Sequence, residues 1–373
     1  MIYLDSAATS LLKPDGVAYA VTDAICTMAS PGRGAYAPAM RAADVCYECR
    51  ESLARLFSVP QPEKIVFTLN ATHALNIAVR SLARGKTRVL ISGYEHNSVT
   101  RPLRAAGAEI TAVKTPLFDV GALLQEFERE LNTADAAVFT HVSNVFGFIL
   151  PIRELSAMCR KREVPFLIDA SQSAGALDID FASLGADFIA MPGHKGLMGP
   201  QGTGVLICKN EAEPLLYGGS GSESRLQRMP DYLPDRLEAG THNVAGIAGL
   251  NESVRYILRE TPRRIGETEK RLLSVFANEL EGTPHLRLFR DRDGKNQAGV
   301  ISLLPLSMDC EELGARLSDA GVCVRAGLHC APLAHETAGT VSTGTVRASF
   351  SPFNSDEEAA AAARIIRKIL KSS

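Results

Sequence analysis

The segment from residue 64 to residue 208 alternates short apolar runs with longer stretches of helical periodicity, and this pattern restricts the fold more than any other feature. The apolar runs cover residues 64–68, 88–92, 109–113, 136–141, 165–169, 187–191 and 204–208. Strands that alternate with helices indicate a mostly parallel sheet with helices on both faces. The sequence therefore predicts an α/β fold built on a mostly parallel, seven-stranded sheet.

The C-terminal third follows another pattern. Residues 246–280 are predicted to form one long helix. Short strands follow at 285–289, 299–304, 322–326 and 345–350, with a helix at 310–321 and a last helix from about Asp356. We expect a large domain at residues 15–250 and a smaller α+β domain at 251–373, with residues 1–14 packing against the smaller one.

Composition excludes some function classes. The 40 basic and 42 acidic residues give a formal net charge of -2, which favours neither nucleic acid nor an anionic membrane as a partner. The N-terminus does not have the pattern of a signal peptide, and no apolar run is long enough to span a membrane. The eight cysteines are scattered, which fits a reducing, cytoplasmic compartment. Cys46 and Cys49 form a lone C-x-x-C within a helical stretch, which does not favour a metal or redox site.

Polar residues follow several predicted strands, where a parallel sheet gathers them at one edge. Thr72 follows the first strand and is predicted to cap the next helix, whose first N–H groups then either bind an anion or form an ordinary cap. His96 and Asn144 follow two further strands. Asp169 ends an apolar strand, where a carboxylate is costly unless a cation pairs with it, and Gln172 comes three residues later.

A glycine-rich segment, "AMPGHKGLMGPQGTG" at residues 190–204, contains Lys195. This lysine can bind a nucleotide phosphate, attack a carbonyl as an amine, or lie as a solvated charge on a turn. The phosphate-loop motif requires glycines before the lysine and a hydroxyl residue after it, and Lys195 is followed by Gly196. A dinucleotide fingerprint belongs after the first strand of the sheet, whereas this segment lies late in it. The attacking amine and the solvated charge remain open.

An acid placed 26 residues before a strand-end lysine suits a pyridoxal phosphate enzyme, in which the lysine binds the cofactor aldehyde and the acid keeps the ring nitrogen protonated. At these residues the sequence resembles the class V aminotransferase family, of fold type I among pyridoxal phosphate enzymes. Within that family it is similar to the cysteine desulfurases and selenocysteine lyases. The resemblance runs from "YLDSAATS" near the N-terminus to "VRASFSPFNSDEE" near the C-terminus.

The resemblance implies a role for each matching residue of the cofactor site. Lys195 is the lysine that binds the cofactor, Asp169 pairs with the ring nitrogen, Gln172 bonds the ring hydroxyl oxygen and His96 stacks on the ring. The residues implied to hold the phosphate are Ala71, Thr72, His73, His194 and, reaching the neighbouring subunit of a homodimer, Thr241. Many relatives carry a serine where this chain has Pro192, which lacks both a hydroxyl and an N–H, so the phosphate needs other donors.

The resemblance also implies the substrate and the reaction. Asn144 lies near the carboxylate of L-cysteine, and Arg347 anchors that carboxylate through its guanidinium fork. Cys330 lies in "CVRAGLHCAPLAHET", where a neighbouring histidine or arginine favours a thiolate, although a free cysteine is often only a small buried side chain. The expected reaction converts L-cysteine to L-alanine, assisted by His96, and leaves a persulfide on Cys330 for a sulfur-acceptor protein.

Three alternatives stay open at the level of sequence. The chain can act on selenocysteine. It can be another pyridoxal phosphate lyase or epimerase, in which Cys330 is incidental. It can also be a catalytically silent family member that serves as a scaffold.

Overall fold

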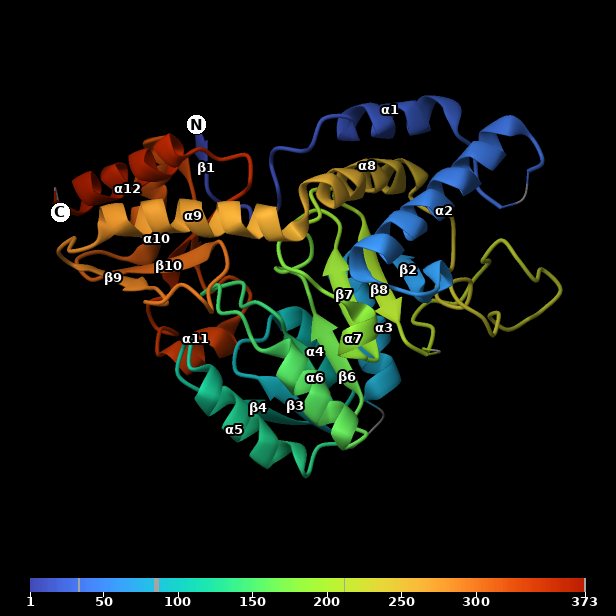
Figure 1. Ribbon diagram of the computed structural model, residues 1–373, viewed down its shortest axis with the longest axis horizontal. Coiled ribbons are helices and arrows are strands. Elements are labelled where there is room, and N and C mark those ends of the chain that lie inside the picture. Colours follow the sequence, from blue (N-terminus) through green and yellow to red (C-terminus); the bar gives the residue numbers. More distant parts are fainter. Residues whose placement is uncertain (33, 84–86, 211, 372–373) are drawn as a thin grey trace.

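The computed structural model describes residues 1–32, 34–83, 87–210 and 212–371 (Figure 1). Its large sheet has the order β2-β8-β7-β6-β5-β3-β4. All neighbouring pairs are parallel except those of β8, which runs antiparallel to β2 and β7. The prediction of seven strands in a mostly parallel sheet is confirmed. The strands are β2 (Ile65–Thr68), β3 (Arg88–Ser92), β4 (Glu109–Val113), β5 (Ala136–Thr140), β6 (Phe166–Asp169), β7 (Phe188–Pro192) and β8 (Gly204–Cys208).

Helices cover both faces of this sheet because alternate strand residues point to opposite sides. On β2, Ile65 and Phe67 pack with one set of helices, while Val66 packs with the other. The first face carries α2 (Ala37–Phe57), α5 (Val120–Leu131), α6 (Ile152–Lys161), α7 (Phe181–Leu184) and α8 (Val244–Glu260). The second carries α3 (Ala71–Leu82) and α4 (Asn97–Ala105), and α1 (Val17–Thr27) lies beside α8 (Figure 1).

The C-terminal part has its own core and an antiparallel sheet of order β12-β13-β10-β9. The N-terminal strand β1 (Ile2–Tyr3) pairs with β11 (Val322–Cys323), so the N-terminus lies in this part of the molecule (Figure 1). The other elements are α9 (Pro262–Leu280), β9 (Leu286–Phe289), β10 (Val300–Pro305), α10 (Cys310–Asp319), β12 (Arg325–Gly327), α11 (Pro332–Ala338), β13 (Thr345–Ser349) and α12 (Asp356–Lys371).

The single helix expected over residues 246–280 is wrong, because the chain forms two helices there. Thr261, between them, has a φ of 68° and ψ of 141°, outside the helical region, and it caps α9 by accepting the N–H of Arg264. Pro262 disfavours a helical conformation in the preceding residue and suits the first position of a helix. The expected domain boundary at residue 250 falls inside α8 and stays a prediction. None of the helices among the described residues has the length and apolar character needed to cross a membrane.

Candidate active site

A pocket of about 510 Å³ lies at the edge of the sheet where β5, β6 and β7 end and where α3 and α4 begin. This is the edge at which parallel α/β sheets bind ligands. The structure brings most of the predicted site residues together in its lining, namely Ala71, Thr72, His96, Asn144, Asp169, Gln172, His194 and Lys195. The lining also includes Ser98, Ser171 and Pro192.

Asp169 and Lys195 give the pocket a carboxylate and an amine with opposed pKa shifts. Asp169 is 2 % exposed, and its Oδ1 accepts the N–H of Ser171 at 2.9 Å and also the Ser171 hydroxyl. Burial raises the pKa of Asp169, while Ser171 and Lys195 oppose that rise. Burial lowers the pKa of Lys195 to about 8, and Asp169 opposes that change. In the described part of the chain, no hydrogen bond reaches Oδ2 of Asp169 or Nζ of Lys195, so both atoms are available to a ligand.

His96 caps α4 and is held in one tautomer. Its Nδ1 accepts the N–H of Ser98 at 3.0 Å, so the proton of the neutral ring is assigned to Nε2. Burial and the nearby charge of Lys195 lower the pKa of His96 to about 4, and the ring is therefore neutral at pH 7. The Ser98 hydroxyl lies 2.9 Å from that of Thr72, and this contact joins the first turns of α3 and α4.

The start of α3 differs from the expectation at Thr72, whose predicted capping role is wrong. Asn70 is the cap, and its Oδ1 accepts the N–H of His73 at 2.9 Å. This geometry leaves the N–H groups of Ala71 and Thr72 without an acceptor among the described residues. Two free N–H groups at the start of a twelve-residue helix suit an anion.

Two residues predicted to hold the phosphate lie elsewhere. His73 and Thr241 line a neighbouring pocket of about 680 Å³, and the Nδ1 of His73 accepts the N–H of Leu69 at 3.3 Å. Thr241 is exposed on the surface. His73 therefore contributes a capped N–H to the turn, and its ring faces away from the first pocket.

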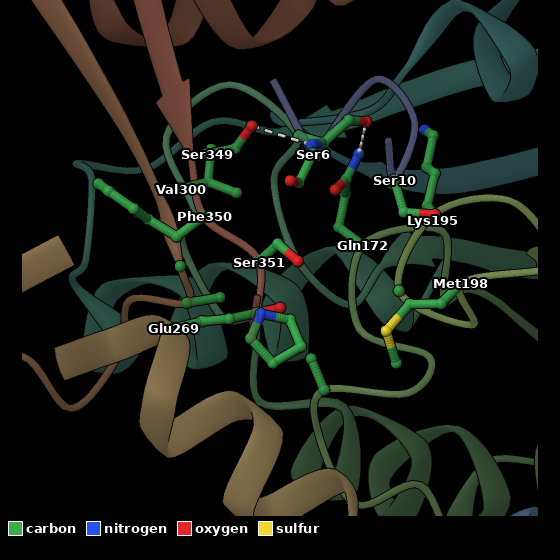
Figure 2. A pocket seen from close by; sticks show the side chains of 16 residues that line it. Ser6, Ser10, Gln172, Lys195, Met198, Glu269, Val300, Ser349, Phe350 and Ser351 are labelled. Atoms are coloured by element: carbon green, nitrogen blue, oxygen red, sulfur yellow. Dashed lines mark hydrogen bonds between the residues drawn. The ribbon is translucent and has the colours of Figure 1, made fainter. Parts of the chain in front are cut away.

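The N-terminal segment secures the lysine loop. The N–H of Ser10 donates to the carbonyl of His194 at 2.9 Å, and the Thr9 hydroxyl lies 3.1 Å from Nδ1 of His194. Burial lowers the pKa of His194 to about 4, so its ring is neutral. Figure 2 shows the side-chain amide of Gln172 donating to a backbone carbonyl, that of Ala7, with a length of 2.9 Å, beside a second pocket of about 480 Å³ that Lys195 also lines.

Glycine permits the close packing beneath Lys195. Gly175 has a φ of +88°, and a Cβ added there would lie 2.2 Å from the carbonyl oxygen of Gly196. A Cβ on Gly196 would lie 2.4 Å from the carbonyl oxygen of Ala174. Both positions therefore exclude a side chain for steric reasons.

Arg347 lies behind the pocket, outside its lining. It is 2 % exposed on β13; its Nη1 donates to the carbonyl of Asn144 at 3.0 Å and its Nη2 to Oδ1 of Asp5 at 2.7 Å. The Nδ2 of Asn144 donates in turn to the carbonyl of His329 at 2.9 Å. Asn144 thus connects the pocket with the loop that carries Cys330.

Cys330 is exposed and lies beside the pocket, although it is not part of the lining. Its carbonyl accepts the N–H of Asn97, the residue after His96, at 2.8 Å. The expectation that a neighbouring histidine promotes a thiolate is wrong for His329. That ring is buried with Nε2 3.1 Å from the carbonyl of Thr345, and burial lowers its pKa to about 2, so it carries no positive charge.

Three residues that were not predicted also shape the site: Asp5, Ser98 and Ser171. Ser171 comes two positions after Asp169 and Ser98 two positions after His96, so a hydroxyl residue close to a predicted site residue is the local signal for both. Asp5 bonds a residue 342 positions away, and no local pattern indicates that contact.

Comparison with known proteins places this arrangement in a family. A sequence profile of the family described as Aminotransferase class-V matches residues 2–361. The chain belongs to the class-V aminotransferase family. A protein of Methanothermobacter thermautotrophicus named probable cysteine desulfurase is 34 % identical, over 96 % of this chain and 92 % of that one.

Solved structures agree with this assignment. The apo structure of a cysteine desulfurase from Thermococcus onnurineus NA1 has a TM-score of 0.91 at 30 % identity and covers 100 % of this chain and 95 % of that one. The cysteine desulfurase CsdA of Escherichia coli has a TM-score of 0.85 at 26 % identity, with the same coverage. These likenesses confirm the predicted fold class.

Proposed function

We propose that this chain is a pyridoxal phosphate-dependent cysteine desulfurase, which converts L-cysteine to L-alanine and retains the sulfur as a persulfide on Cys330. The names of its relatives support this activity. The contact that carries the proposal is the 2.8 Å hydrogen bond from Asn97 to the carbonyl of Cys330, because it holds an exposed thiol beside a pocket that contains Lys195 and Asp169.

The pocket residues fit the cofactor. When bound, pyridoxal phosphate supplies an aldehyde for a lysine amine and a protonated ring that withdraws electrons from the substrate. Lys195 has the available amine, and the unpartnered Oδ2 of the buried Asp169 would hold the ring nitrogen. The N–H groups of Ala71 and Thr72 and the hydroxyls of Thr72 and Ser98 would hold the phosphate, with His194 nearby.

The protein groups divide the proton transfers between them. A pKa of about 8 leaves part of Lys195 as a neutral amine at pH 7 to 8, and this amine removes the α-proton of the substrate. His96 is neutral with its proton on Nε2, so at that atom it donates a hydrogen bond to the bound substrate or cofactor and orients it. Asn144 and Arg347 hold the substrate carboxylate.

Cys330 performs the sulfur transfer. Its thiolate attacks the sulfur of L-cysteine, so a sulfur–sulfur bond forms as the carbon–sulfur bond breaks. The electron pair of the broken bond stays with the carbon, which takes a proton and leaves as L-alanine. Exposure of Cys330 lets the thiol of an acceptor protein take up the terminal sulfur by thiol exchange, and a reducing cytosol would keep both thiols available.

We further propose a homodimer with shared sites, in which Thr241 contacts the phosphate bound by the neighbouring subunit. Its exposure and its distance from this chain's own cofactor pocket support that role. Sedimentation analysis, together with cofactor affinity of Thr241→Ala, tests both parts of the proposal.

Mass spectrometry of the cofactor-loaded protein after incubation with L-cysteine tests the function directly. We expect Cys330 to gain the mass of one sulfur atom and Cys330→Ala to lose alanine production, while Cys26→Ala, which removes another exposed cysteine, keeps it. Undiminished alanine production by Cys330→Ala would refute the persulfide mechanism. Lys195→Ala is expected to abolish the absorbance of the bound cofactor, and a colourless unaltered protein would favour a scaffold. Parallel assays with L-selenocysteine compare the two substrates.

A further inference from the structure

The guanidinium group of Arg347 is already paired with a carboxylate in the free protein. Its Nη2 lies 2.7 Å from Oδ1 of Asp5, and its Nη1 donates to the carbonyl of Asn144. Nη2 belongs to both edges of the guanidinium fork, Nε/Nη2 and Nη1/Nη2, through which a carboxylate binds with two parallel hydrogen bonds. Asp5 therefore bonds the one nitrogen that any bidentate ligand of Arg347 needs.

The remaining donor of the fork points to a missing partner. Nε of Arg347 is buried and has no hydrogen-bond partner among the described residues. A buried N–H of a charged group is costly to leave unpaired. The fork is thus bonded at both terminal nitrogens and unsatisfied at Nε. A second carboxylate that bonds Nε and the other N–H of Nη2 would lie close to the Asp5 carboxylate at that nitrogen, and the repulsion between the two like charges favours release of Asp5.

Asp5 can move its side chain while its backbone stays fixed. The backbone beside Asp5 follows β13, since the N–H of Ser349 donates to the carbonyl of Leu4 at 2.8 Å and the N–H of Ala7 to Oγ of Ser349 at 2.9 Å (Figure 2). The side chain of Asp5 is 20 % exposed, whereas that of Arg347 is 3 % exposed. A rotation of the Asp5 side chain therefore reaches solvent, but Arg347 stays buried.

We propose that Asp5 substitutes for the substrate's carboxylate in the free enzyme and is displaced from Arg347 when the amino acid binds. This inference rests on the proposed function and deepens it. A buried guanidinium without a counter-charge is strongly unfavourable, so the arginine stays paired before and after the exchange. Only a ligand with its own carboxylate replaces the lost charge, and amines that lack one leave Asp5 in place. Asp5 thereby contributes to substrate specificity.

A purely orienting role for Asp5 predicts the opposite result. If Asp5 only holds Arg347 in position, its removal weakens carboxylate binding. If Asp5 competes for Arg347, its removal strengthens that binding, since a ligand's apparent affinity falls with the fraction of protein that is competent to bind. If Asp5 occupies Arg347 about nine-tenths of the time, only about a tenth of the protein is free to bind the carboxylate. Removal of Asp5 then raises the apparent affinity for the ligand about tenfold.

The test uses the cofactor-loaded enzyme and two probes without sulfur, L-alanine and ethylamine, which differ only by the carboxylate. Binding is followed by the change in cofactor absorbance. We expect Asp5→Asn to bind L-alanine about tenfold more tightly and ethylamine unchanged. Asp135→Asn, which removes an aspartate from an exposed 2.9 Å ion pair with Arg88, is the control and should alter neither. Asp5→Ser serves as the second variant if Asp5→Asn does not fold.

The outcomes separate this inference from the proposed function. Weaker or unchanged L-alanine binding in the Asp5 variants would overturn the inference. In Arg347→Ala, L-alanine affinity should fall, and adding Asp5→Asn should then produce no gain. If Arg347→Ala binds L-alanine normally, the carboxylate anchor of the proposed function fails, whatever the Asp5 variants show.

Discussion

The buried pair of Arg50 and Glu238 should be essential for stability. Arg50 on α2 is 7 % exposed and Glu238 is 6 % exposed, and Nη2 of the arginine lies 2.5 Å from Oε2 of the glutamate. Glu238 also accepts the N–H of Phe67 at 2.6 Å, and the Arg50 guanidinium lies 4.3 Å from the centre of the Phe67 ring. The pair thus joins α2, β2 and the segment before Thr241.

Removal of one partner should be more harmful than removal of both. Arg50→Met leaves the Glu238 carboxylate buried without its cation, which costs about 3–5 kcal/mol. The apolar double variant Arg50→Met/Glu238→Leu leaves no buried charge, and its main loss is the unpaired N–H of Phe67, about 1–3 kcal/mol. We therefore expect the single variant to lose about 4 kcal/mol and the double variant about 2 kcal/mol.

Urea unfolding of the cofactor-free protein, followed by circular dichroism, measures these losses without the stabilisation that a bound cofactor adds. Arg88→Met is the matched control. Its ion pair with Asp135 is about half exposed, with side chains 52 % and 45 % accessible, so its unfolding midpoint should stay unchanged. With Glu238→Leu measured alone as well, a double variant that loses the sum of the Arg50→Met and Glu238→Leu losses would refute the reasoning, because the charges would then not be coupled.

Three further predictions concern the site and its supports. Borohydride trapping of Lys195 by pyridoxal phosphate should increase as the pH rises through about 8, because only the neutral amine reacts. Asp169→Asn should shift the midpoint of this pH dependence to lower pH, since Asp169 raises the pKa of Lys195. A midpoint near the ordinary lysine value of 10.5 in the unaltered protein would contradict the prediction. Gly175→Ala should lower both the melting temperature and the cofactor affinity, since its Cβ would lie 2.2 Å from the carbonyl oxygen of Gly196. The control Gly282→Ala, at φ +70° with nothing within 4 Å of the added Cβ, should lower only stability, by about 1 kcal/mol. Burial raises the pKa of Glu95 to about 8, so the folded state binds more protons than the unfolded state between pH 4.5 and 8. The contribution of Glu95 to stability should therefore fall across that range and then level off, and in Glu95→Gln the urea midpoint should fall less between pH 4.5 and 8 than in the unaltered protein.

The large sheet could be predicted because most of its strands are nearly continuous apolar runs, as expected for strands buried on both faces, while the edge strand β4 is partly exposed. The strand order could not be predicted, since β8 lies between β2 and β7 and runs antiparallel to both. That placement depends on contacts between distant segments. The break at Thr261 was missed because the apolar periodicity continues through it, although Pro262 was a visible signal.

The site could be predicted where strand ends bring residues together, as for Asp169 and Lys195. Side-chain direction could not be predicted from neighbouring positions. His329 and Cys330 are adjacent and have φ values of 50° and 56°, both in the left-handed region. That backbone turns the histidine into the interior and leaves the cysteine exposed, so adjacency in sequence gives the thiol no charged neighbour.

Pro192 offers no donor at a position where the family resemblance implies one. It ends β7, lines the pocket and pairs in register with Gly204, and it has neither an N–H nor a hydroxyl to offer an anion. Ser98 lines the same pocket from the first turn of α4, where its hydroxyl contacts that of Thr72 at 2.9 Å. An anion at the first turns of α3 and α4 would have two hydroxyls and two helix N-termini, which favour negative charge. The proline is therefore compatible with the proposed phosphate binding, because α3 and α4 offer donors and none is required from the end of β7.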